Sequence, residues 1–591
     1  MNIVYIAERR TVKYTVAVLL FIAVSLAFSR RIFDYDVWFH LAIGKEILTN
    51  LRIPQTEVFV YPLLDTPGAY HAWGFGVLVY FLYDHFGYWG ISCLSGILAG
   101  LLAVLLYLAA SRGKPLEGWA LLLLSGLLVL VEFRFVHRPE TVLYLFLAMY
   151  IFSLERFSST RNRKWLFPLP AISLLLSWFH PTALVLMIVF FSYVLGFLWD
   201  WIRSRKIDRR MGITLALVFI SSILGALVNP YGIKQLLLPI LFAGEKTFQH
   251  GVPELSPILE TMFKNRFILL IIVGLVPFFA LRNGRRITYI LLFSFFAYLT
   301  FKYARNLALM AIVLYVPIVL SFQTFTENSA WLSRVVSNKF FSVLPAVLLI
   351  VTTLSFMRHG RWGADPANDL FPVKSAQFML EHRPQGRIFN HFHSGNYLEW
   401  KLYPSYRVSI DGRHYTYDKS LELYEQVFWL KDGWQRVLLG YHVETIITPG
   451  TNIVEGSLVP LVLELDADPS WSLVVIEPAA MLFVRTEQLE NLPGVQILNK
   501  NLIWTQVIQE TLNNLKNYPD AVKSYLSLGI AYFKLHEFHS ALGPFREYLR
   551  HFPDDTQALQ VVSLIESAEV GDLASAEELE ALYSSGRYKP N

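Results

Sequence analysis

The chain of 591 residues has little charge and almost no cysteine. Only 16% of its residues are charged and 54% are hydrophobic, and its mean hydropathy of +0.42 lies outside the range of ordinary soluble domains. The single cysteine, Cys93, excludes an intrachain disulfide and a cysteine-based zinc site. These shortages predict an integral membrane protein without thiol chemistry.

The usual sequence signals for nucleotides and nucleic acids are also missing. The sequence has no Walker-type phosphate loop and no dinucleotide fingerprint after a strand. It has no block of Lys and Arg interleaved with aromatic residues, so we expect no nucleic-acid partner. Chemistry driven by a nucleotide is therefore disfavoured.

Long apolar runs recur between residues 14 and 357 and then stop. As helices, runs of this length cross roughly 30 Å of hydrocarbon, and we predict about eleven spans. They lie at 14–29, 88–111, 119–133, 139–154, 166–178, 182–202, 212–228, 266–281, 287–301, 306–323 and 340–357. The first run follows basic residues, and its length favours an uncleaved anchor over a cleaved signal peptide.

Basic residues alternate along the predicted loops and indicate an orientation. With the N-terminus in the cytoplasm, successive inner turns are rich in Arg and Lys, as the positive-inside rule requires. Arg30 and Arg31 are exceptions, because they are basic residues on the predicted outer side. An odd number of spans places the chain after residue 358 outside. We therefore predict a multi-pass membrane protein with extracytoplasmic C-terminal domains.

The chain divides into three predicted parts. Residues 1–358 form a transmembrane domain with a first outer loop at 32–87, residues 359–500 a small extracytoplasmic α/β domain, and residues 501–591 a helical domain. The middle part has strand-like runs at 387–389, 406–410, 444–448, 473–476 and 481–484, and a helical pattern at 421–435.

The C-terminal part matches the spacing of a tetratricopeptide repeat. The matching positions are Tyr525, Leu528, Gly529, Tyr532, Ala541, Phe545 and Pro553. One repeat cannot bury its own apolar face, so flanking helices are expected at about 505–516, 556–569 and 574–584. Such a stack usually binds a protein or peptide; the alternative is a helical cap on the preceding domain.

Ionisable residues suited to chemistry gather on the predicted outer side of the membrane. Charge that is kept beside lipid usually serves a function. The group comprises Asp34, Asp36, His40, His71, Arg134, Arg138, Glu140, His180, Glu254 and Arg305. Structural explanations stay open, because the aspartates could be solvated at a helix end and the residues from 134 to 140 could form an ion-pair network.

This group suits the transfer of a sugar from a polyprenyl phosphate to an acceptor hydroxyl. Asp36 or Asp34 would take the acceptor's proton, and an arginine would stabilise the departing phosphate. The candidate substrate and phosphate ligands are His40, His71, Arg134, Arg138, Glu140, His180 and Arg305. Asp36 and Glu254 could hold a divalent ion such as Mg or Mn. The two aspartates can face one ion or substrate only if the segment is extended.

The segment Asp36-Val37-Trp38-Phe39-His40 resembles the first-loop aspartate motif of the GT-C glycosyltransferases. Val37 and His40 depart from the proline and asparagine of the oligosaccharyltransferase catalytic subunit. The sequence Trp-Trp-Asp-Tyr-Gly does not occur, so recognition of asparagine sequons is not implied.

A longer resemblance is to bacterial GT-C-like membrane proteins with a trailing repeat domain. It rests on Asp36 to Gly44, Ile53-Pro54, His71 with Trp73, Arg138-Pro139-Glu140, Asn229-Pro230-Tyr231-Gly232, Glu254, Arg305-Asn306, Phe389-Asn390, Gly395 and Asp411-Gly412-Arg413. Ala72 stands where that family commonly has glutamate. The resemblance implies a GT-C fold and an inverting hexosyl or pentosyl transfer, with Asp36 as base or metal ligand and Asp34 second.

Other interpretations stay open beside the glycosyltransferase. A non-catalytic membrane scaffold could use the outer repeat to recruit envelope-assembly partners, and it would not need the carboxylate pair. A transporter is disfavoured, because the sequence has no duplicated half with matching broken helices. The turn at residues 411–413 either pairs its charges locally or binds the acceptor.

Overall fold

A computed structural model describes residues 2–585 except 65, 69, 113–114, 206–207, 243–255, 282, 337, 339, 414–418, 453–454 and 571. The chain forms two compact units. The first comprises Met1–Ile53 and Tyr70–Pro366, and the second comprises Pro54–Ala69 and Ala367–Asn591. The second unit thus includes a piece of the predicted first outer loop. The predicted three-part division stays a prediction.

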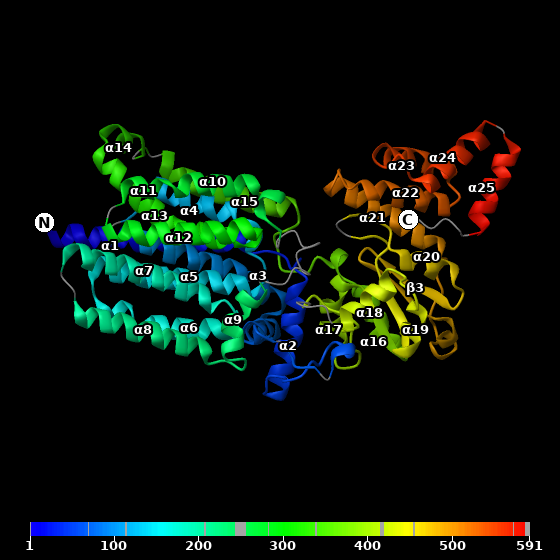
Figure 1. The fold of residues 1–591 in the computed structure, drawn as a ribbon, viewed down its shortest axis with the longest axis horizontal. Helices are drawn as coiled ribbons and strands as arrows, with labels where there is room; N and C mark the ends of the chain where they lie inside the picture. The colour runs from blue at the N-terminus through cyan, green and yellow to red at the C-terminus, as the bar shows by residue number, and fades with distance from the viewer. Residues whose placement is uncertain are drawn as a thin grey trace. The chain divides into compact units, whose positions relative to one another are not determined.

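The first unit is a bundle of helices (Figure 1). Its longer helices are α1 (Asn2–Phe28), α3 (Trp73–Ser111), α5 (Pro139–Thr160), α7 (Ala183–Ser204), α8 (Arg209–Leu227), α12 (Asn283–Lys302), α13 (Leu307–Asn328) and α15 (Phe340–Arg358). The shorter ones are α2 (Asp36–Asn50), α4 (Gly118–Leu130), α6 (Pro168–Phe179), α9 (Ile233–Phe242), α10 (Lys264–Gly274), α11 (Val276–Ala280) and α14 (Ala330–Val336). Single 3-10 turns include η2 (Glu132–Arg134), η3 (Arg163–Trp165), η6 (Ile258–Glu260) and η7 (Ala304–Asn306).

The predicted spans coincide with helices, which confirms a mainly helical membrane fold. By length and composition, six helices of the described chain could cross a membrane: Thr11–Phe28, Trp73–Ser111, Pro139–Thr160, Ala183–Ser204, Arg209–Leu227 and Ala304–Asn328. The run at 266–281 is divided between α10 and α11, where Pro277 lacks a backbone donor. Gly87 breaks α3 at φ 59°. The number of spans therefore stays a prediction.

Helix α2 packs closely against α3 because two glycines meet at the crossing. A Cβ built on Gly44 of α2 would overlap the backbone carbonyl of Gly76 in α3. In the other direction, a Cβ on Gly76 would lie 2.9 Å from the carbonyl oxygen of His40. Backbones approach this closely only where side chains are missing. The two glycines therefore fix the position of the helix that begins with Asp36.

The second unit contains a four-stranded sheet in the order β1-β2-β4-β3. The strands are β1 (Arg387–Asn390), β2 (Val443–Thr448), β3 (Trp471–Glu477) and β4 (Ala480–Arg485). Strand β1 is parallel to β2, and β4 is antiparallel to both of its neighbours. The associated helices are α16 (Val373–His382), α17 (Gly395–Leu402), α18 (Lys419–Phe428), α19 (Trp434–Gly440) and α20 (Pro460–Ala467). The 3-10 turns are η1 (Tyr61–Leu63), η8 (Asn368–Leu370), η9 (Phe392–Ser394) and η10 (Thr486–Asn491).

Five helices follow the sheet along the chain (Figure 1). They are α21 (Asn501–Asn517), α22 (Val522–Lys534), α23 (Phe538–His551), α24 (Thr556–Glu569) and α25 (Leu573–Ser585). Gly529 of α22 faces the ring of Phe545 in α23, and a Cβ there would lie 2.9 Å from the ring. These two helices therefore meet at a glycine, as the sequence pattern requires.

Four of the five predicted strand runs lie in β1 to β4, but the run at 406–410 does not join the sheet. Val408 instead forms a parallel bridge with Val60 of the outer-loop segment.

The predicted helix at 421–435 is also interrupted, because Leu430 and Gly433 have φ values of 53° and 82°. A positive φ ends a helix, so two helices, α18 and α19, form here.

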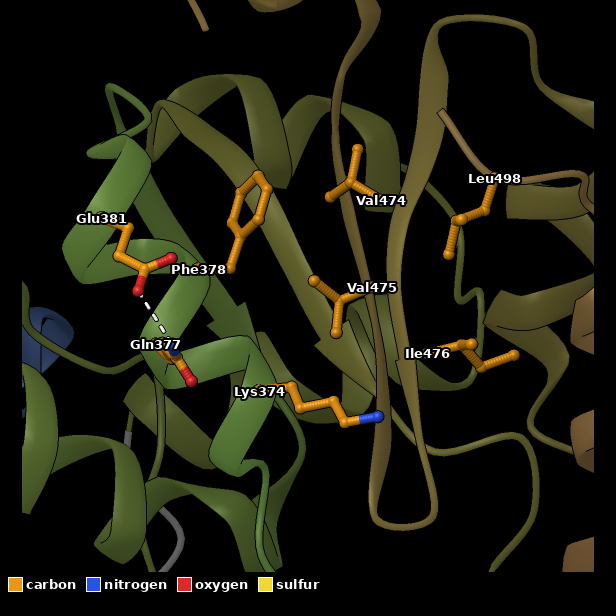
Figure 2. Close-up of a pocket in the computed structure, with 8 residues that line it drawn as sticks. All are labelled: Lys374, Gln377, Phe378, Glu381, Val474, Val475, Ile476 and Leu498. Carbon is orange, nitrogen blue, oxygen red and sulfur yellow. Dashed lines mark hydrogen bonds between the residues drawn. The ribbon is translucent and has the colours of Figure 1, made fainter. Parts of the chain in front are cut away.

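An open groove of about 330 Å³ lies beside the sheet, between α16 and β3 (Figure 2). Phe378, Val475 and Leu498 are among its apolar lining residues, and Lys374 and Glu381 also line it. No candidate residue that the structure describes lines this groove. It therefore lies apart from the predicted chemistry.

Candidate active site

The two aspartates of the outer loop lie at the start of α2. Asp36 is the first residue of the helix, and Asp34 precedes it by two residues. The Oδ1 atom of Asp34 accepts the backbone N–H of Asp36 at 2.9 Å, so Asp34 satisfies a donor that the helix start leaves without an intrahelical partner. The helix dipole also favours the negative charge of Asp36 at this end.

Both carboxylates converge on Arg138. The Nε atom of Arg138 lies 2.6 Å from Oδ2 of Asp34 and 3.2 Å from Oδ2 of Asp36. The convergence does not require an extended segment, because Asp34 lies before the helix and Asp36 lies in its first turn. The Asp34 side chain is only 6% exposed, whereas that of Asp36 is 40% exposed. Asp36 is therefore the carboxylate that a substrate can reach.

A second charged group surrounds Glu140, in the first turn of α5. Oε1 of Glu140 lies 3.4 Å from Nη2 of Arg134, which ends η2. His180, Arg138 and Arg305 also lie close enough to interact electrostatically with the Glu140 carboxylate. His180 follows α6, and Arg305 lies in η7 before α13. Turns from separate parts of the bundle therefore bring these predicted residues together.

The two remaining histidines lie among aromatic rings. His40 is buried one turn after Asp36, and its ring meets Phe75 edge-on at a centroid distance of 4.9 Å. The ring of His71, just before α3, lies 4.6 Å from the ring of Tyr231. Burial lowers the pKa of the His71 imidazole to about 4, so this ring is neutral at pH 7. The His71 ring therefore supplies no positive charge for a phosphate at neutral pH.

The described residues do not by themselves form a metal site. They contain no group of three or more His, Cys, Asp and Glu side chains arranged to hold an ion. The Arg138 guanidinium lies where a cation shared by Asp34 and Asp36 would be placed. Glu254, the other predicted ligand, lies outside the described residues. The divalent ion stays a prediction, and no step below depends on it.

Sequence reasoning missed a buried ion pair near these turns. Nη2 of Arg30 lies 2.7 Å from Oε2 of Glu132, and the Arg30 guanidinium lies 4.2 Å from the ring centroid of Phe356. Arg31 donates to three backbone carbonyls, those of Gly360, Asp365 and Pro366. The two arginines that oppose the predicted orientation thus have structural contacts within the first unit. The only signal for the pair was that Arg30 directly follows one predicted span and Glu132 lies at the end of another.

Comparison with known proteins finds no match by sequence, but it finds solved structures with a similar fold. No family model matches the chain, and no curated protein matches it. The archaeal oligosaccharyltransferase AglB from Archaeoglobus fulgidus, solved with an inhibitory peptide and a dolichol-phosphate, superposes with a TM-score of 0.61. The match has 10% identity and covers 89% of this chain and 86% of AglB.

A second similar structure is apo ArnT from Cupriavidus metallidurans. It has a TM-score of 0.50 and 11% identity, and the match covers 82% of this chain and 99% of ArnT. Both are GT-C membrane glycosyltransferases. The predicted resemblance is therefore confirmed at the level of the fold: the chain has the fold of the GT-C glycosyltransferases.

Proposed function

We propose that this protein transfers a hexosyl or pentosyl group from a polyprenyl-phosphate donor to a protein, lipid or glycan acceptor. The reaction takes place at the extracytoplasmic face of a bacterial inner membrane. The observation that supports this most is the placement of Asp36, a partly exposed carboxylate at a helix start, beside a cluster of arginines. AglB, which has a similar fold, was solved with a dolichol-phosphate, a lipid of the proposed donor class.

In the proposed reaction, Asp36 is the general base. Its carboxylate takes the proton of the acceptor hydroxyl while the acceptor oxygen forms a bond to the anomeric carbon of the sugar. The bond between that carbon and the phosphate oxygen breaks at the same time, and the polyprenyl phosphate leaves with the electron pair. Attack opposite the leaving group inverts the anomeric centre.

Asp34 and Arg138 position the base in this account. Asp34 is buried, accepts the backbone N–H of Asp36 and pairs with Arg138, so its oxygens are already engaged. Arg138 contacts both aspartates and lies close to Glu140. It therefore links the carboxylate that takes the proton to the group that would hold the phosphate.

Arg134 and Arg305 are the proposed phosphate ligands. A guanidinium matches the oxygens of a phosphate with a planar pair of donors and keeps its charge at all physiological pH values. Both lie near Glu140, whose negative charge holds them in place before the donor binds. The Nδ1 atom of His180 forms a hydrogen bond of 2.7 Å with the hydroxyl group of Thr182. The His180 ring also lies close to Glu140.

We also propose a domain organisation and a topology. The N-terminus is cytoplasmic, about eleven helices cross the bilayer, and the second unit is extracytoplasmic. Residues 359–500 form a small α/β domain, and helices α21 to α25 form a tetratricopeptide-like stack that binds a protein or peptide. The contact of Gly529 with Phe545 supports the repeat assignment.

Mass spectrometry of envelope glycans tests the proposed function in cells. Strains with the wild-type protein, without it and with Asp36→Asn are compared at matched protein levels. We expect one glycan to be missing from both the deletion and the Asp36→Asn strain. A glycan profile that does not change in either strain would instead support the membrane scaffold, and pull-down through residues 505–584 would then identify its partners.

A further inference from the structure

A segment of the first outer loop is built into the second unit. The backbone N–H of Tyr61 donates to the carbonyl of Val408, and the N–H of Val408 donates to the carbonyl of Phe59, each at 3.0 Å. Nε of Arg407 donates to the carbonyl of Val58 at 3.0 Å. Tyr61 is buried in the hydrophobic core of this unit. Residues 57–64, which we call the loop strap, are therefore held by backbone pairing and by burial.

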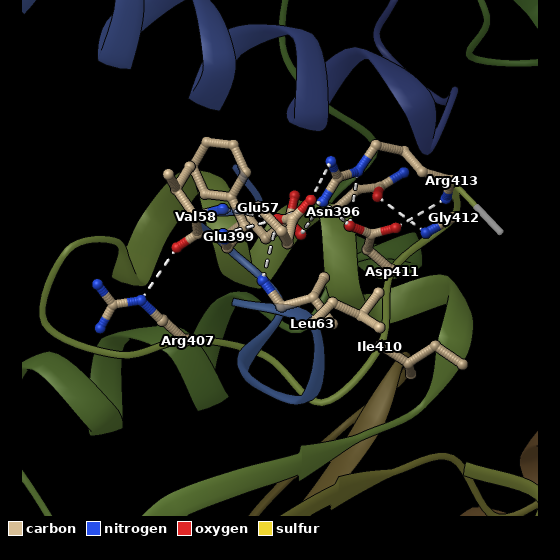
Figure 3. Close-up of polar contacts among 12 residues, drawn as sticks. Glu57, Val58, Leu63, Asn396, Glu399, Arg407, Ile410, Asp411, Gly412 and Arg413 are labelled. Carbon is tan, nitrogen blue, oxygen red and sulfur yellow. Dashed lines mark hydrogen bonds and ion pairs between the residues drawn. The ribbon is translucent and has the colours of Figure 1, made fainter. Parts of the chain in front are cut away.

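Glu57 anchors the start of the loop strap (Figure 3). Its Oε1 atom accepts the backbone N–H groups of Val58, Phe59 and Val60 at 3.1, 2.8 and 3.2 Å. The Arg413 guanidinium donates to both Glu57 oxygens, from Nη1 at 2.9 Å and from Nη2 at 3.0 Å. This is a two-pronged pair on a carboxylate that is 6% exposed. Five donors therefore converge on this one carboxylate.

Two further carboxyl groups share the same arginine. Asp411 accepts the backbone N–H of Arg413 at 2.8 Å and its Nε at 2.7 Å, and it also pairs with Nη2. Glu399, on α17, lies 3.6 Å from Nη2 of Arg413. Both carboxyl groups are 1% exposed. Three buried acids therefore surround one guanidinium, and three ionised acids would leave two negative charges uncompensated.

The hydrogen bonds indicate which of the three acids is neutral. Asp411 and Glu57 each accept hydrogen bonds from several N–H donors, so neither needs a proton of its own to be satisfied. By contrast, neither Glu399 oxygen receives a hydrogen bond from any donor in the described part of the chain. The neighbour that faces Glu399 is the Asp411 carboxylate. A proton on Glu399 would turn this repulsive contact into a hydrogen bond donated to Asp411.

The electrostatic surroundings of Glu399 agree with this assignment. Burial is the largest cause, followed by the Asp411 charge, and together they raise the pKa of Glu399 well above its usual range. Arg413 lowers it, and Glu57 raises it further. These three charged groups are the ones that face Glu399 from the loop strap and from residues 411–413. Burial and the facing Asp411 carboxylate therefore both favour the neutral form of Glu399.

We infer that Glu399 donates a proton to Asp411, and that this shared proton keeps Arg413 closed on Glu57 and the loop strap fixed. Loss of the proton adds a third buried negative charge next to Arg413 and draws the guanidinium away from Glu57. The four residues form a proton-dependent clasp. The chain runs from α2 through Ile53 directly into the clasped segment, so opening the clasp frees the loop that follows the helix with Asp36.

The direction of the pH effect follows from the raised pKa. The closed clasp holds a proton that the opened clasp releases at any pH above the ordinary pKa of a glutamic acid. Closure is therefore fully stable below that value, and it weakens by about tenfold for each pH unit until the raised pKa is reached. Glu399→Gln removes this dependence, because an amide N–H can donate to Asp411 and does not titrate.

Hydrogen exchange of the full-length protein in detergent micelles tests the clasp. Protection of the amides of residues 58–60 is measured between about pH 6 and about pH 9 and corrected for the intrinsic rate. In the wild type, we expect protection to fall with rising pH by up to about tenfold per unit. In Glu399→Gln we expect no such fall, and in Arg413→Gln a loss of protection at every pH. No donor or acceptor is needed, so the result is independent of the proposed function.

A matched control and a fold check make each outcome decisive. Lys431→Gln removes an exposed ion pair of 2.7 Å in the same unit and should leave the loop strap unchanged. The amides of β2 report whether Arg413→Gln still folds; if they also lose protection, Glu57→Gln replaces it as the test of the clasp. Equal protection of the wild type and Glu399→Gln at every pH would overturn the shared proton. Full protection in Glu57→Gln would overturn the clasp itself.

Discussion

Arg138 donates a hydrogen bond of 2.6 Å from its Nε atom to the buried carboxylate of Asp34, which lies 104 residues earlier in the chain. Asp34 in turn accepts the backbone N–H of Asp36. The pair therefore joins the turn before α5 to the turn before α2. Asp34 is buried and Asp36 is partly exposed, so the first aspartate holds the second at the helix start while the second stays accessible.

We expect Arg138→Gln to destabilise the first unit as well as to reduce transfer. Removing the guanidinium leaves Asp34 buried without its ionic partner, which costs about 3 kcal/mol. Thermal unfolding in detergent micelles measures this loss. The control is Arg161→Gln, which removes an exposed pair with Asp200 at 4.0 Å and should cost less than about 1 kcal/mol. Equal stability of the two variants would show that the Asp34 pair is not structural.

Because α2 and α3 cross closely, adding one methyl group at the crossing should strongly destabilise the first unit. Gly44→Ala places a Cβ in the space of the Gly76 backbone, so the helices must separate, at a cost of about 2 kcal/mol or more. Gly126→Ala is the matched control, since a Cβ there meets nothing within 4 Å and alanine favours the helix. Melting temperatures of the two variants should therefore move in opposite directions. A neutral Gly44→Ala would contradict the close crossing.

Two glycines of the C-terminal helices allow the same kind of comparison, between a crowded position and an open one. Gly529→Ala pushes a Cβ to within 2.9 Å of the Phe545 ring, whereas Gly543→Ala in α23 meets nothing within 4 Å. We expect Gly529→Ala to lower the stability of the helices by about 1 to 3 kcal/mol and Gly543→Ala to leave it unchanged or raise it. Hydrogen exchange in α22 measures the difference. Similar exchange in both variants would contradict repeat-like packing of α22 on α23.

Local patterns in the sequence predicted the helices and most of the strands. Apolar runs predicted the long helices of the first unit, because a helix in lipid satisfies its own backbone hydrogen bonds. The strands at 443–448 and 480–485 were predictable from their β-branched, aromatic and other apolar residues, which become part of the buried sheet. The grouping of Arg134, Glu140, His180 and Arg305 followed from their shared side of the predicted bundle.

Contacts between distant segments were not predictable from local pattern. Nothing near Val408 indicates that it pairs with residue 60 instead of joining the sheet. The clasp depends on Glu57, Glu399 and Arg413, which are separated along the chain and are individually ordinary surface residue types. The pairing of Asp34 with Arg138 likewise depends on how α2 and α5 pack, so local pattern did not show which of the two aspartates is buried and which is exposed.

Transfer by the purified protein in vesicles tests the central claim most directly. The donors are polyprenyl-phosphate sugars extracted from the membranes of the producing cells, and release of free polyprenyl phosphate is measured with the native envelope acceptor fraction. Asp84→Asn, which changes an exposed carboxylate of the same unit, is the matched control. The account predicts that Asp36→Asn lowers the rate by at least about 100-fold while Asp84→Asn retains it. An Asp36→Asn protein that folds normally and transfers at the wild-type rate would contradict the account.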